Sequence, residues 1–391
     1  MKKIYLDNAA TTKIDDRVFD AMVPYLKHSF GNPSSVHTFG RETKVLLEDA
    51  RDTIAEFIGA KPAEIYFTSG GTEANNFAVK GIAFNNLGSR NHIITSPIEH
   101  HAVIDTLEYL KQRFGFEITY TPVNKYGEVD LDYLTNSITN KTFLISIMHS
   151  NNEIGVINDI AKISEIIGER KIALHTDSVQ SIGKTRFNVN EINCTTATLS
   201  AHKIYGPKGI GALYIKKGTA IDKSTHGGKQ ERDRRGGTEN IPAIAGMKKA
   251  VEILKAQMDS DIEHYSKLKD YFISKFSSEF GEKIIINSKI SENSLPNIVN
   301  ISFNPDLTGF EKPVRSNIDP DTIIIRLDMK GIAVSSGSAC TSGAVQPSHV
   351  LKAIGYDDNT AKSSLRVSFG RENKTEEIDY LIEALKEIVN S

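Results

Sequence analysis

The 391-residue sequence contains only two cysteines, Cys194 and Cys340, and no tryptophan. So few cysteines exclude a disulfide scaffold and are typical of a reducing compartment. Neither cysteine belongs to a CxxC pair, so a structural zinc site is not expected. An excess of one charge is also missing, because 47 Lys and Arg stand against 49 Asp and Glu and the formal net charge is −2. Direct nucleic-acid binding through a general basic field is therefore not expected.

Long apolar runs are missing as well. No window reaches the roughly 18 apolar residues that a membrane helix needs. Near the start, Asp7 and Asn8 interrupt the apolar residues before they could form the core of a signal peptide. We therefore expect a cytoplasmic protein without a membrane partner. The composition, with 39% hydrophobic and 25% charged residues, is that of an ordinary globular protein, and the length suggests two or three domains.

Short β-rich runs alternate with helical patterns through the first part of the chain. The alternation predicts a large α/β domain with a mostly parallel sheet. Several of the runs are continuously apolar, as expected for strands that are covered on both faces. The full set of runs is residues 65–68, 92–95, 143–148, 172–176, 196–199 and 212–215.

The pattern changes near residue 240. Pro242 predicts the start of a helix, and fewer strands follow it. Thr375 is the predicted N-cap of an amphipathic helix at the end of the chain. We expect the residues after about 255 to form a smaller α+β domain. Within it, the segment from Pro305 to Pro320 indicates a long irregular loop.

Ligands of parallel α/β sheets bind at the carboxyl ends of the strands, so the residues just after the runs are the first candidates for a site. Run 65–68 is followed by Ser69-Gly70-Gly71-Thr72 and a helical pattern. Two glycines at a helix start favour a phosphate cradle, although a simple tight turn between strand and helix explains them equally well. The sequence has no GxGxxG motif, and Gly183-Lys184-Thr185 lacks the upstream glycine of a P-loop. A dinucleotide enzyme and a P-loop NTPase are therefore disfavoured.

Two further strand ends carry ionisable side chains. Asp177 follows run 172–176 and could face a ring-nitrogen cation, or simply cap a helix. Lys203 follows run 196–199 and could form a Schiff base, or simply be solvated. A phosphate cradle, an acid and an amine together are what pyridoxal phosphate requires. His100 could stack on such a ring; a metal ligand and a surface histidine are the alternatives, and no spaced set of metal ligands is present.

The two cysteines differ in their surroundings. Cys194 lies just before a predicted strand and is expected to be a passive small hydrophobe. Cys340 lies in Ser335-Ser336-Gly337-Ser338-Ala339-Cys340-Thr341-Ser342-Gly343, a small and polar run that predicts an exposed loop. A thiol on such a loop is a candidate nucleophile, with an incidental cysteine as the alternative.

Taken together, these motifs resemble those of the NifS/IscS-type cysteine desulfurases, which are pyridoxal-phosphate enzymes, over about residues 4–389. The resemblance is carried by Tyr5-Leu6-Asp7-Asn8-Ala9-Ala10-Thr11-Thr12, Gly31-Asn32-Pro33-Ser34-Ser35, Thr68-Ser69-Gly70-Gly71-Thr72-Glu73, Met148-His149-Ser150-Asn151-Asn152-Glu153-Ile154-Gly155, Ser200-Ala201-His202-Lys203-Ile204-Tyr205-Gly206-Pro207-Lys208-Gly209 and the run around Cys340.

The resemblance implies a homodimer of pyridoxal-phosphate fold type I. Residues 16–255 would form the large domain with a mostly parallel seven-stranded sheet, and residues 256–391 the small α+β domain with the cysteine loop. Residues 1–15 would pack with the small domain. The implied reaction converts L-cysteine to L-alanine and leaves a persulfide on Cys340. An acceptor protein, such as an iron–sulfur scaffold or a tRNA-thiolation enzyme, would then take the sulfur.

Residue roles follow from the same resemblance. Lys203 would hold pyridoxal 5'-phosphate as a Schiff base, with Asp177 at the pyridine nitrogen and Gln180 at the phenolate oxygen. His100 would stack on the ring and, with Lys203, move protons. The remaining implied contacts are Asn152, Gly71, Thr72, Ser200 and His202 in the cofactor site, Thr238 at the phosphate of the partner subunit, and Asn32 and Arg366 at the substrate carboxylate.

Other functions stay open at this point. A selenocysteine or cysteine-sulfoxide lyase and an aminotransferase would share the cofactor without needing Cys340, and an inactive paralogue would act only as a binding partner. The sequence departs from the resemblance in two places. Segment 305–320 is longer than expected and could alter access to the site, dimer contacts or the acceptor surface. The sequence also stops at Ser391, where some members carry a longer tail that helps to dock a scaffold.

Overall fold

The computed structural model describes residues 3–291, 293–303, 320–336 and 346–389. Its larger part is built on a seven-stranded sheet with the order β2-β8-β7-β6-β5-β3-β4. Neighbours from β4 to β7 pair in parallel, and β8 is antiparallel to both β7 and β2. The strands are β2 (Ile65–Thr68), β3 (His92–Thr95), β4 (Glu117–Tyr120), β5 (Thr142–Ser146), β6 (Ala173–Asp177), β7 (Thr196–Ser200) and β8 (Gly211–Ile215). The predicted mostly parallel α/β sheet is confirmed.

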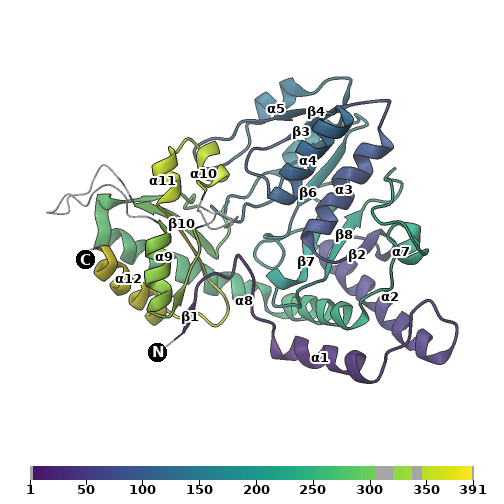
Figure 1. Ribbon diagram of the computed structural model, residues 1–391, viewed down its shortest axis with the longest axis horizontal. Coiled ribbons are helices and arrows are strands. Elements are labelled where there is room, and N and C mark those ends of the chain that lie inside the picture. The colour runs from purple at the N-terminus through teal and green to yellow at the C-terminus, as the bar shows by residue number, and fades with distance from the viewer. Residues whose placement is uncertain (1–2, 292, 304–319, 337–345, 390–391) are drawn as a thin grey trace.

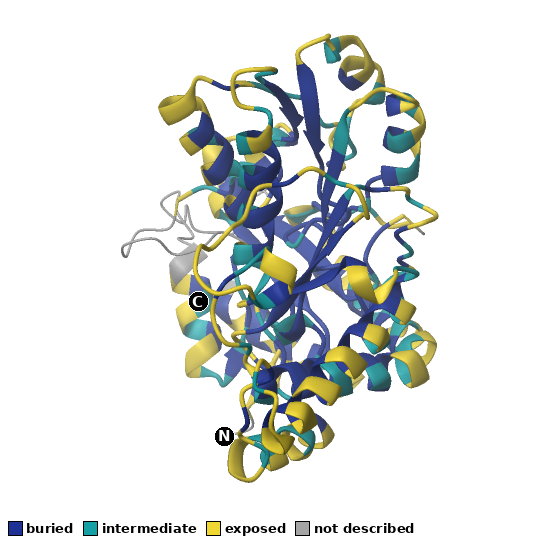
Figure 2. Cartoon of the chain, turned by 90° about the vertical axis from the view of Figure 1, so that its right-hand side faces the viewer, coloured by how far each residue is buried: buried dark blue, intermediate teal, exposed yellow. Residues whose placement is uncertain are grey.

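Helices cover both faces of this sheet (Figure 1). On one face, α3 (Gly71–Asn85) and α4 (His101–Phe114) close a core with alternate strand residues such as Tyr66 and Leu213. On the other face, α2 (Thr38–Ile58), α6 (Ile160–Ile167) and the start of α8 (Ile241–Phe280) pack on residues such as Phe67 and Tyr214. Figure 2 shows most of the sheet buried, and only the edge strand β4 has no buried residue. The remaining helices of this part are α1 (Asp16–Lys27), α5 (Leu131–Ser137) and α7 (Gln230–Asp233).

The smaller part contains an antiparallel sheet with the order β12-β10-β9. Beside it, β1 (Ile4–Tyr5) from the start of the chain pairs in parallel with β11 (Ile332–Ala333). Ile4 and Leu6 belong to the hydrophobic core of this part, so the first residues pack against the last third of the chain. The other elements are β9 (Ile284–Ile286), β10 (Ile298–Phe303), α9 (Pro320–Met329), α10 (His349–Ala353), α11 (Asp358–Lys362), β12 (Ser364–Ser368) and α12 (Thr375–Val389).

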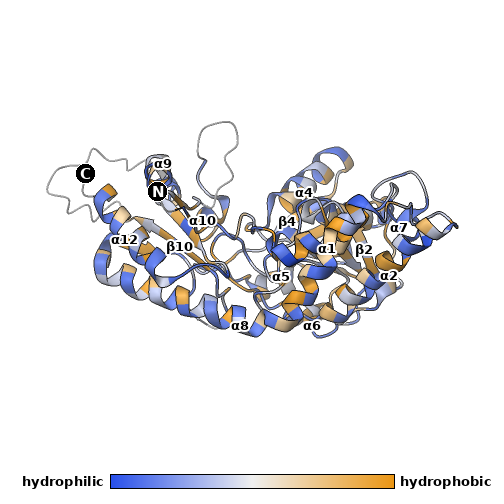
Figure 3. Cartoon of the chain, turned by 90° about the horizontal axis from the view of Figure 1, so that it is seen from below, coloured by the Kyte–Doolittle hydropathy of each residue, from blue (hydrophilic) through white to orange (hydrophobic). Residues whose placement is uncertain are grey.

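Helix α8 joins the two parts. Its 40 residues run along one side of the molecule (Figure 3). Residues up to Leu254 pack in the core under the seven-stranded sheet, and those from Tyr265 onward pack in the core of the smaller part. The helix that Pro242 predicts is therefore present but much longer than expected, and residue 255 lies inside it. An unbroken helix across both cores links their positions.

Several predicted boundaries shift by a few residues. The run 143–148 ends as a strand at Ser146, because the N–H of Met148 donates to the buried Glu99 side chain and leaves the ladder (2.9 Å). Thr375 is the first residue of α12 and not its N-cap. Of the predicted loop from Pro305 to Pro320, only Pro320 lies within the described residues, where it begins α9.

Candidate active site

The polar strand ends named from the sequence meet in one cavity of about 400 Å³ at the carboxyl ends of the parallel strands. Most candidate residues line it, and they are Gly71, Thr72, His100, Asn152, Asp177, Gln180, Ser200, His202, Lys203 and Arg366. Arg366 reaches the cavity from β12, so both parts of the molecule contribute to the site. Asn32 and Thr238 do not line the cavity, and both are exposed. Cys340 lies outside the described residues.

Lys203 ends a short 3-10 turn, residues 201–203, that follows β7. Its Nζ donates to the carbonyl oxygens of Ala9 (2.5 Å) and Ala10 (2.7 Å). Burial lowers the pKa of Lys203 to about 8, and the nearby positive charge of Arg366 adds to the effect. About a tenth of the amine is therefore neutral at pH 7, far more than for an ordinary lysine, and attack on an aldehyde requires this neutral form.

Asp177, at the end of β6, is held by two hydrogen bonds. Its Oδ1 accepts from the N–H of Val179 (3.0 Å), and its Oδ2 accepts from Nδ2 of Asn75 (2.6 Å). The Asn75 oxygen in turn lies 3.1 Å from Nε2 of His175. Since Asn75 donates through its nitrogen, its oxygen must accept, and His175 carries its proton on Nε2. Burial lowers the pKa of His175 to about 4, so this ring stays neutral.

Asn75 was not among the residues named from the sequence. It lies one turn into α3, on the cavity wall, and is buried. A lone asparagine inside a helical pattern carries no signal of its own. Only the packing of α3 against β6 brings it to the carboxylate of Asp177.

His100 is the N-cap of α4 and faces the cavity, to which its ring is exposed. Its Nδ1 accepts from the N–H of Ala102 (3.0 Å), so the neutral ring carries its proton on Nε2. Partial burial of the ring among protein atoms lowers its pKa, the charge of Asp177 opposes this shift, and the charge of Lys203 adds to it. His100 therefore presents a neutral Nε2–H group near neutral pH.

The start of α3, where a phosphate cradle is expected, leaves room only for a glycine at position 71. A Cβ atom added to Gly71 would lie 2.9 Å from Val179 Cγ2 and 3.7 Å from Ser200 Cβ, so a larger residue would fill the space at the helix start. The hydroxyl of Ser200 is buried and has no hydrogen-bond partner among the described residues. Helix N–H groups, the helix dipole and an unpaired hydroxyl together suit a phosphate.

Gln180 and His202 complete the polar lining. Gln180 Nε2 donates to the carbonyl oxygen of Ala9 (2.9 Å), and its buried Oε1 finds no partner in the described part of the chain. His202 Nδ1 lies 3.1 Å from Oγ1 of Thr11. Burial and neighbouring lysines, Lys203 first, lower the pKa of His202 to about 4. The unpaired atoms of Ser200 and Gln180 fit a polar ligand such as pyridoxal phosphate.

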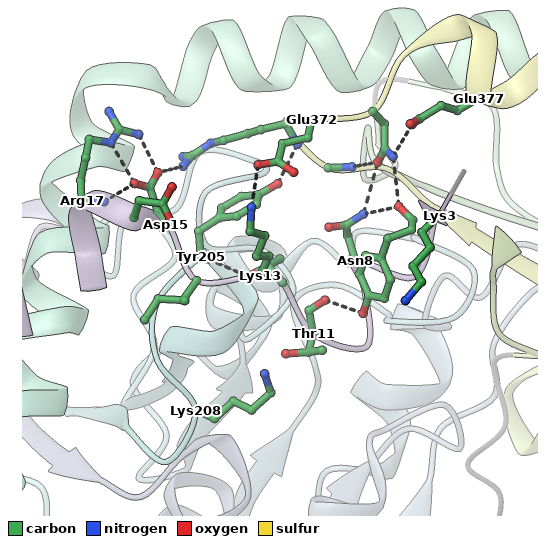
Figure 4. A pocket seen from close by; sticks show the side chains of 17 residues that line it. Lys3, Asn8, Thr11, Lys13, Asp15, Arg17, Tyr205, Lys208, Glu372 and Glu377 are labelled. Atoms are coloured by element: carbon green, nitrogen blue, oxygen red, sulfur yellow. Dashed lines mark hydrogen bonds and ion pairs between the residues drawn. The ribbon is translucent and has the colours of Figure 1, made fainter. Parts of the chain in front are cut away.

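The N-terminal segment forms the wall behind Lys203. Ala9 and Ala10 line the cavity described above, whereas Asn8, Thr11 and Thr12 line a second cavity of about 680 Å³ (Figure 4). The Thr12 hydroxyl donates to the carbonyl oxygen of His202 (2.8 Å). The wall is thus tied to the turn that carries Lys203, which positions the amine.

Of the two cysteines, Cys194 lies within the described residues. Cys194 is fully buried, and burial raises the pKa of its thiol to about 12. It therefore stays protonated near neutral pH and is a poor nucleophile.

No group of three or more His, Cys, Asp or Glu side chains suited to a metal ion occurs within the described ranges. None of the helices in those ranges is long and apolar enough to cross a membrane.

The seven-stranded sheet, the strand-end lysine and aspartate, and the cradle at α3 define a pyridoxal-phosphate enzyme of fold type I. Residues 4–381 match the profile of the aminotransferase class-V family, and the chain belongs to this family. Its enzymes depend on pyridoxal phosphate.

Several relatives resemble the chain over nearly its whole length. It is 46% identical to "Cysteine desulfurase IscS" of Dictyoglomus turgidum over 99% of this chain and 95% of the relative. It is 45% identical to the protein of the same name from Methanosarcina thermophila, over 99% and 92%. A solved structure called "NIFS-LIKE PROTEIN" superposes with a TM-score of 0.90 at 37% identity, covering 99% of both chains. The structure "SspA in complex with cysteine" has a TM-score of 0.79 at 35% identity, covering 94% of this chain and 99% of that one.

Proposed function

We propose that this protein is a cysteine desulfurase that converts L-cysteine to L-alanine and retains the sulfur as a persulfide on Cys340. The observation that carries the proposal is the meeting of Lys203, Asp177 and the Gly71 cradle in one cavity, with Arg366 at its edge. The names of the relatives support the choice of L-cysteine as the substrate. Overall, L-cysteine and a thiol give alanine and a persulfide, so one C–S bond breaks, one S–S bond forms and atoms balance.

The described residues divide the work of this reaction. Pyridoxal phosphate, when bound, supplies an electron sink for the pair released at the amino-acid carbon. Lys203 provides the amine that holds the cofactor, and Asp177 provides the negative charge that keeps the pyridine nitrogen protonated. Ser200, His202, Thr72 and the N–H groups near Gly71 would hold the phosphate. Asn152 and Gln180 would complete the ring site.

Proton movement is assigned to two groups. Lys203, with its pKa near 8, can accept and return a proton near neutral pH. His100 is a donor through Nε2–H, because its Nδ1 is occupied by the Ala102 amide. Arg366 would bind the substrate carboxylate with the guanidinium donors that face the cavity.

We also propose a homodimer. Asn32 and Thr238 lie outside the cavity of their own chain, and both are exposed. Near Asn32, large apolar side chains are exposed to an unusual degree: Phe30 is 74%, Val36 is 88% and Phe39 is 54% exposed. Phe30 and Phe39 stack with ring centroids 5.5 Å apart, so they form a joined apolar surface. A second copy covering this surface would bring Asn32 near the other subunit.

The persulfide would pass its sulfur to an acceptor protein, such as an iron–sulfur scaffold or a tRNA-thiolation enzyme. The net charge of −2 gives no support for a direct nucleic-acid partner. A cytoplasmic location is proposed from the low cysteine content, which suits a reducing compartment.

The test compares the two cysteines. Cys340→Ala is expected to retain bound cofactor and L-cysteine binding but to lose sulfide release by several powers of ten, because an essential nucleophile is removed. Cys194→Ala is the matched control and should keep sulfide release, since its thiol is buried and protonated. Alanine, sulfide and the persulfide adduct are measured with L-cysteine and a reductant. Sulfide release that survives Cys340→Ala, or an adduct on Cys194, would favour a lyase.

A further inference from the structure

Asp7 is an acidic residue that contacts Arg366 of the active-site cavity, and no role has so far been assigned to it. It follows β1 in the N-terminal segment, and its backbone bridges to Ser368 at the end of β12. Its Oδ1 accepts a hydrogen bond from Nη2 of Arg366 at 2.8 Å. The two side chains are 19% and 5% exposed, so the pair is largely shielded from water. Charge pairs in such places interact far more strongly than pairs on the surface.

Arg366 does not depend on Asp7 alone for its orientation. Its Nη1 donates to the carbonyl oxygen of Asn152 at 3.0 Å, and β12 pairs with β10 around it. The Nε atom is buried and has no hydrogen-bond partner in the described part of the chain. A guanidinium has five N–H donors, so donors remain for a ligand while Asn152 still holds the group in place.

The same two charges act on Lys203. Arg366 lowers the pKa of the Lys203 amine, and Asp7 raises it, so both charges lie within electrostatic reach of that amine. A substrate carboxylate bound to Arg366 would therefore lie beside the carboxylate of Asp7. Two like charges in a shielded site oppose each other, and each makes the other harder to accommodate.

We propose that Asp7 is the resident counter-ion of Arg366, which compensates the guanidinium in the empty site and competes with the carboxylate of the bound amino acid. Asp7 is thus an affinity-determining residue: it keeps the buried cation paired between turnovers and weakens the hold on the carboxylate of the product. The inference rests on the proposed role of Arg366, but it does not depend on sulfur transfer.

The test measures binding of L-alanine to the Asp7→Asn holoenzyme through the visible absorbance of the bound cofactor. Binding is expected to tighten about tenfold relative to the wild type, because the competing charge is gone while Asn152 still orients Arg366. Ethylamine, which lacks the carboxylate, should bind with unchanged affinity. Glu372→Gln is the matched control, because Glu372 is an exposed acid of the neighbouring cavity, 3.4 Å from Lys13, and it should change neither affinity.

Two further measurements guard against a folding defect. Asp7→Glu keeps the charge and should bind L-alanine within about twofold of the wild type. Without ligand, Asp7→Asn should melt at a lower temperature than the wild type, because Arg366 has lost its charged partner. Added L-alanine should raise the melting temperature of Asp7→Asn by more than it raises that of the wild type. If Asp7→Asn does not fold alone, refolding with L-alanine should recover it, and failure to recover it counts against the proposal.

Unchanged or weaker L-alanine binding to Asp7→Asn would overturn the inference, as would equal tightening toward ethylamine. A wild-type enzyme that releases no sulfide from L-cysteine, while Asp7→Asn still tightens L-alanine binding, would instead disprove the desulfurase reaction and leave the role of Asp7 standing. The two failures are therefore distinguishable.

Discussion

At the scale of single residues, the surroundings of Lys203 set the pH at which it can capture the cofactor. Burial lowers its pKa from 10.5 to about 8. Only the neutral amine attacks an aldehyde, so capture of pyridoxal phosphate by the apo-protein should speed up as pH rises through about 8 and then level off. The rate is followed by absorbance after mixing between about pH 6 and about pH 10. A rate that keeps rising toward the ordinary lysine value of 10.5 would contradict the shift.

The residues at strand ends were predictable from the sequence, whereas their partners were not. Asp177 and Lys203 stand out because each directly follows an apolar run, which places it at the ligand-binding edge of a parallel sheet. Asn75 and Asp7 carry no such signal. Their importance arises from contacts across the fold, with Asp177 and Arg366, which lie 102 and 359 residues away in the sequence.

At the scale of elements, the cradle depends on how closely β8 approaches the turn before α3. A Cβ atom on Gly211 would lie 2.5 Å from the Leu199 carbonyl oxygen and 2.8 Å from Gly70 Cα, and both are backbone atoms. Gly211→Ala should therefore push β8 away from the cradle, destabilise the fold by about 2–3 kcal/mol and weaken cofactor binding. Denaturant unfolding and cofactor titration measure the two effects.

Gly209→Ala is the matched control for that substitution. Gly209 has φ +78 but nothing within 4 Å of an added Cβ, so it carries only the cost of a left-handed backbone, about 1 kcal/mol. It should lose some stability and keep its cofactor affinity. Equal loss of cofactor in both variants would show that the close approach of β8 is unimportant.

The strands of the large sheet and helix α8 differ in how well local sequence patterns predict them. The apolar runs located six strands of the large sheet within one or two residues, because strands buried on both faces have a strong signal. Strand β4, at the edge of the sheet, was missed, because none of its residues is buried and it has no continuous apolar run. Helix α8 was predicted only at its start. Its continuation past residue 255 depends on Tyr265, Leu268 and Phe272 packing in a second core, and the local pattern does not show that this core shares a helix with the first.

At the scale of the whole molecule, the dimer proposal predicts that each site takes Thr238 from the partner subunit. Thr238→Val should weaken cofactor binding at both sites of its own homodimer, and Lys203→Ala should abolish covalent attachment at both sites of its own. In a mixed dimer, the site with Lys203 from the Thr238→Val chain would receive an intact Thr238 from the Lys203→Ala chain. That site should bind the cofactor with wild-type affinity, while the other site carries both defects.

The mixed dimer is prepared by co-expressing the two variants with different tags and purifying through both, and cofactor content and affinity are measured by absorbance. One wild-type-affinity site per dimer is the expected result. A mixed dimer of Lys203→Ala with the wild type is the control, and its single Lys203 site should look the same. If Thr238 acted within its own chain, every site in the first mixture would keep one defect and no affinity would return. Such a result, or failure to isolate a doubly tagged species, would overturn the shared-site dimer, because only exchange of Thr238 between subunits can restore an intact site from two defective chains.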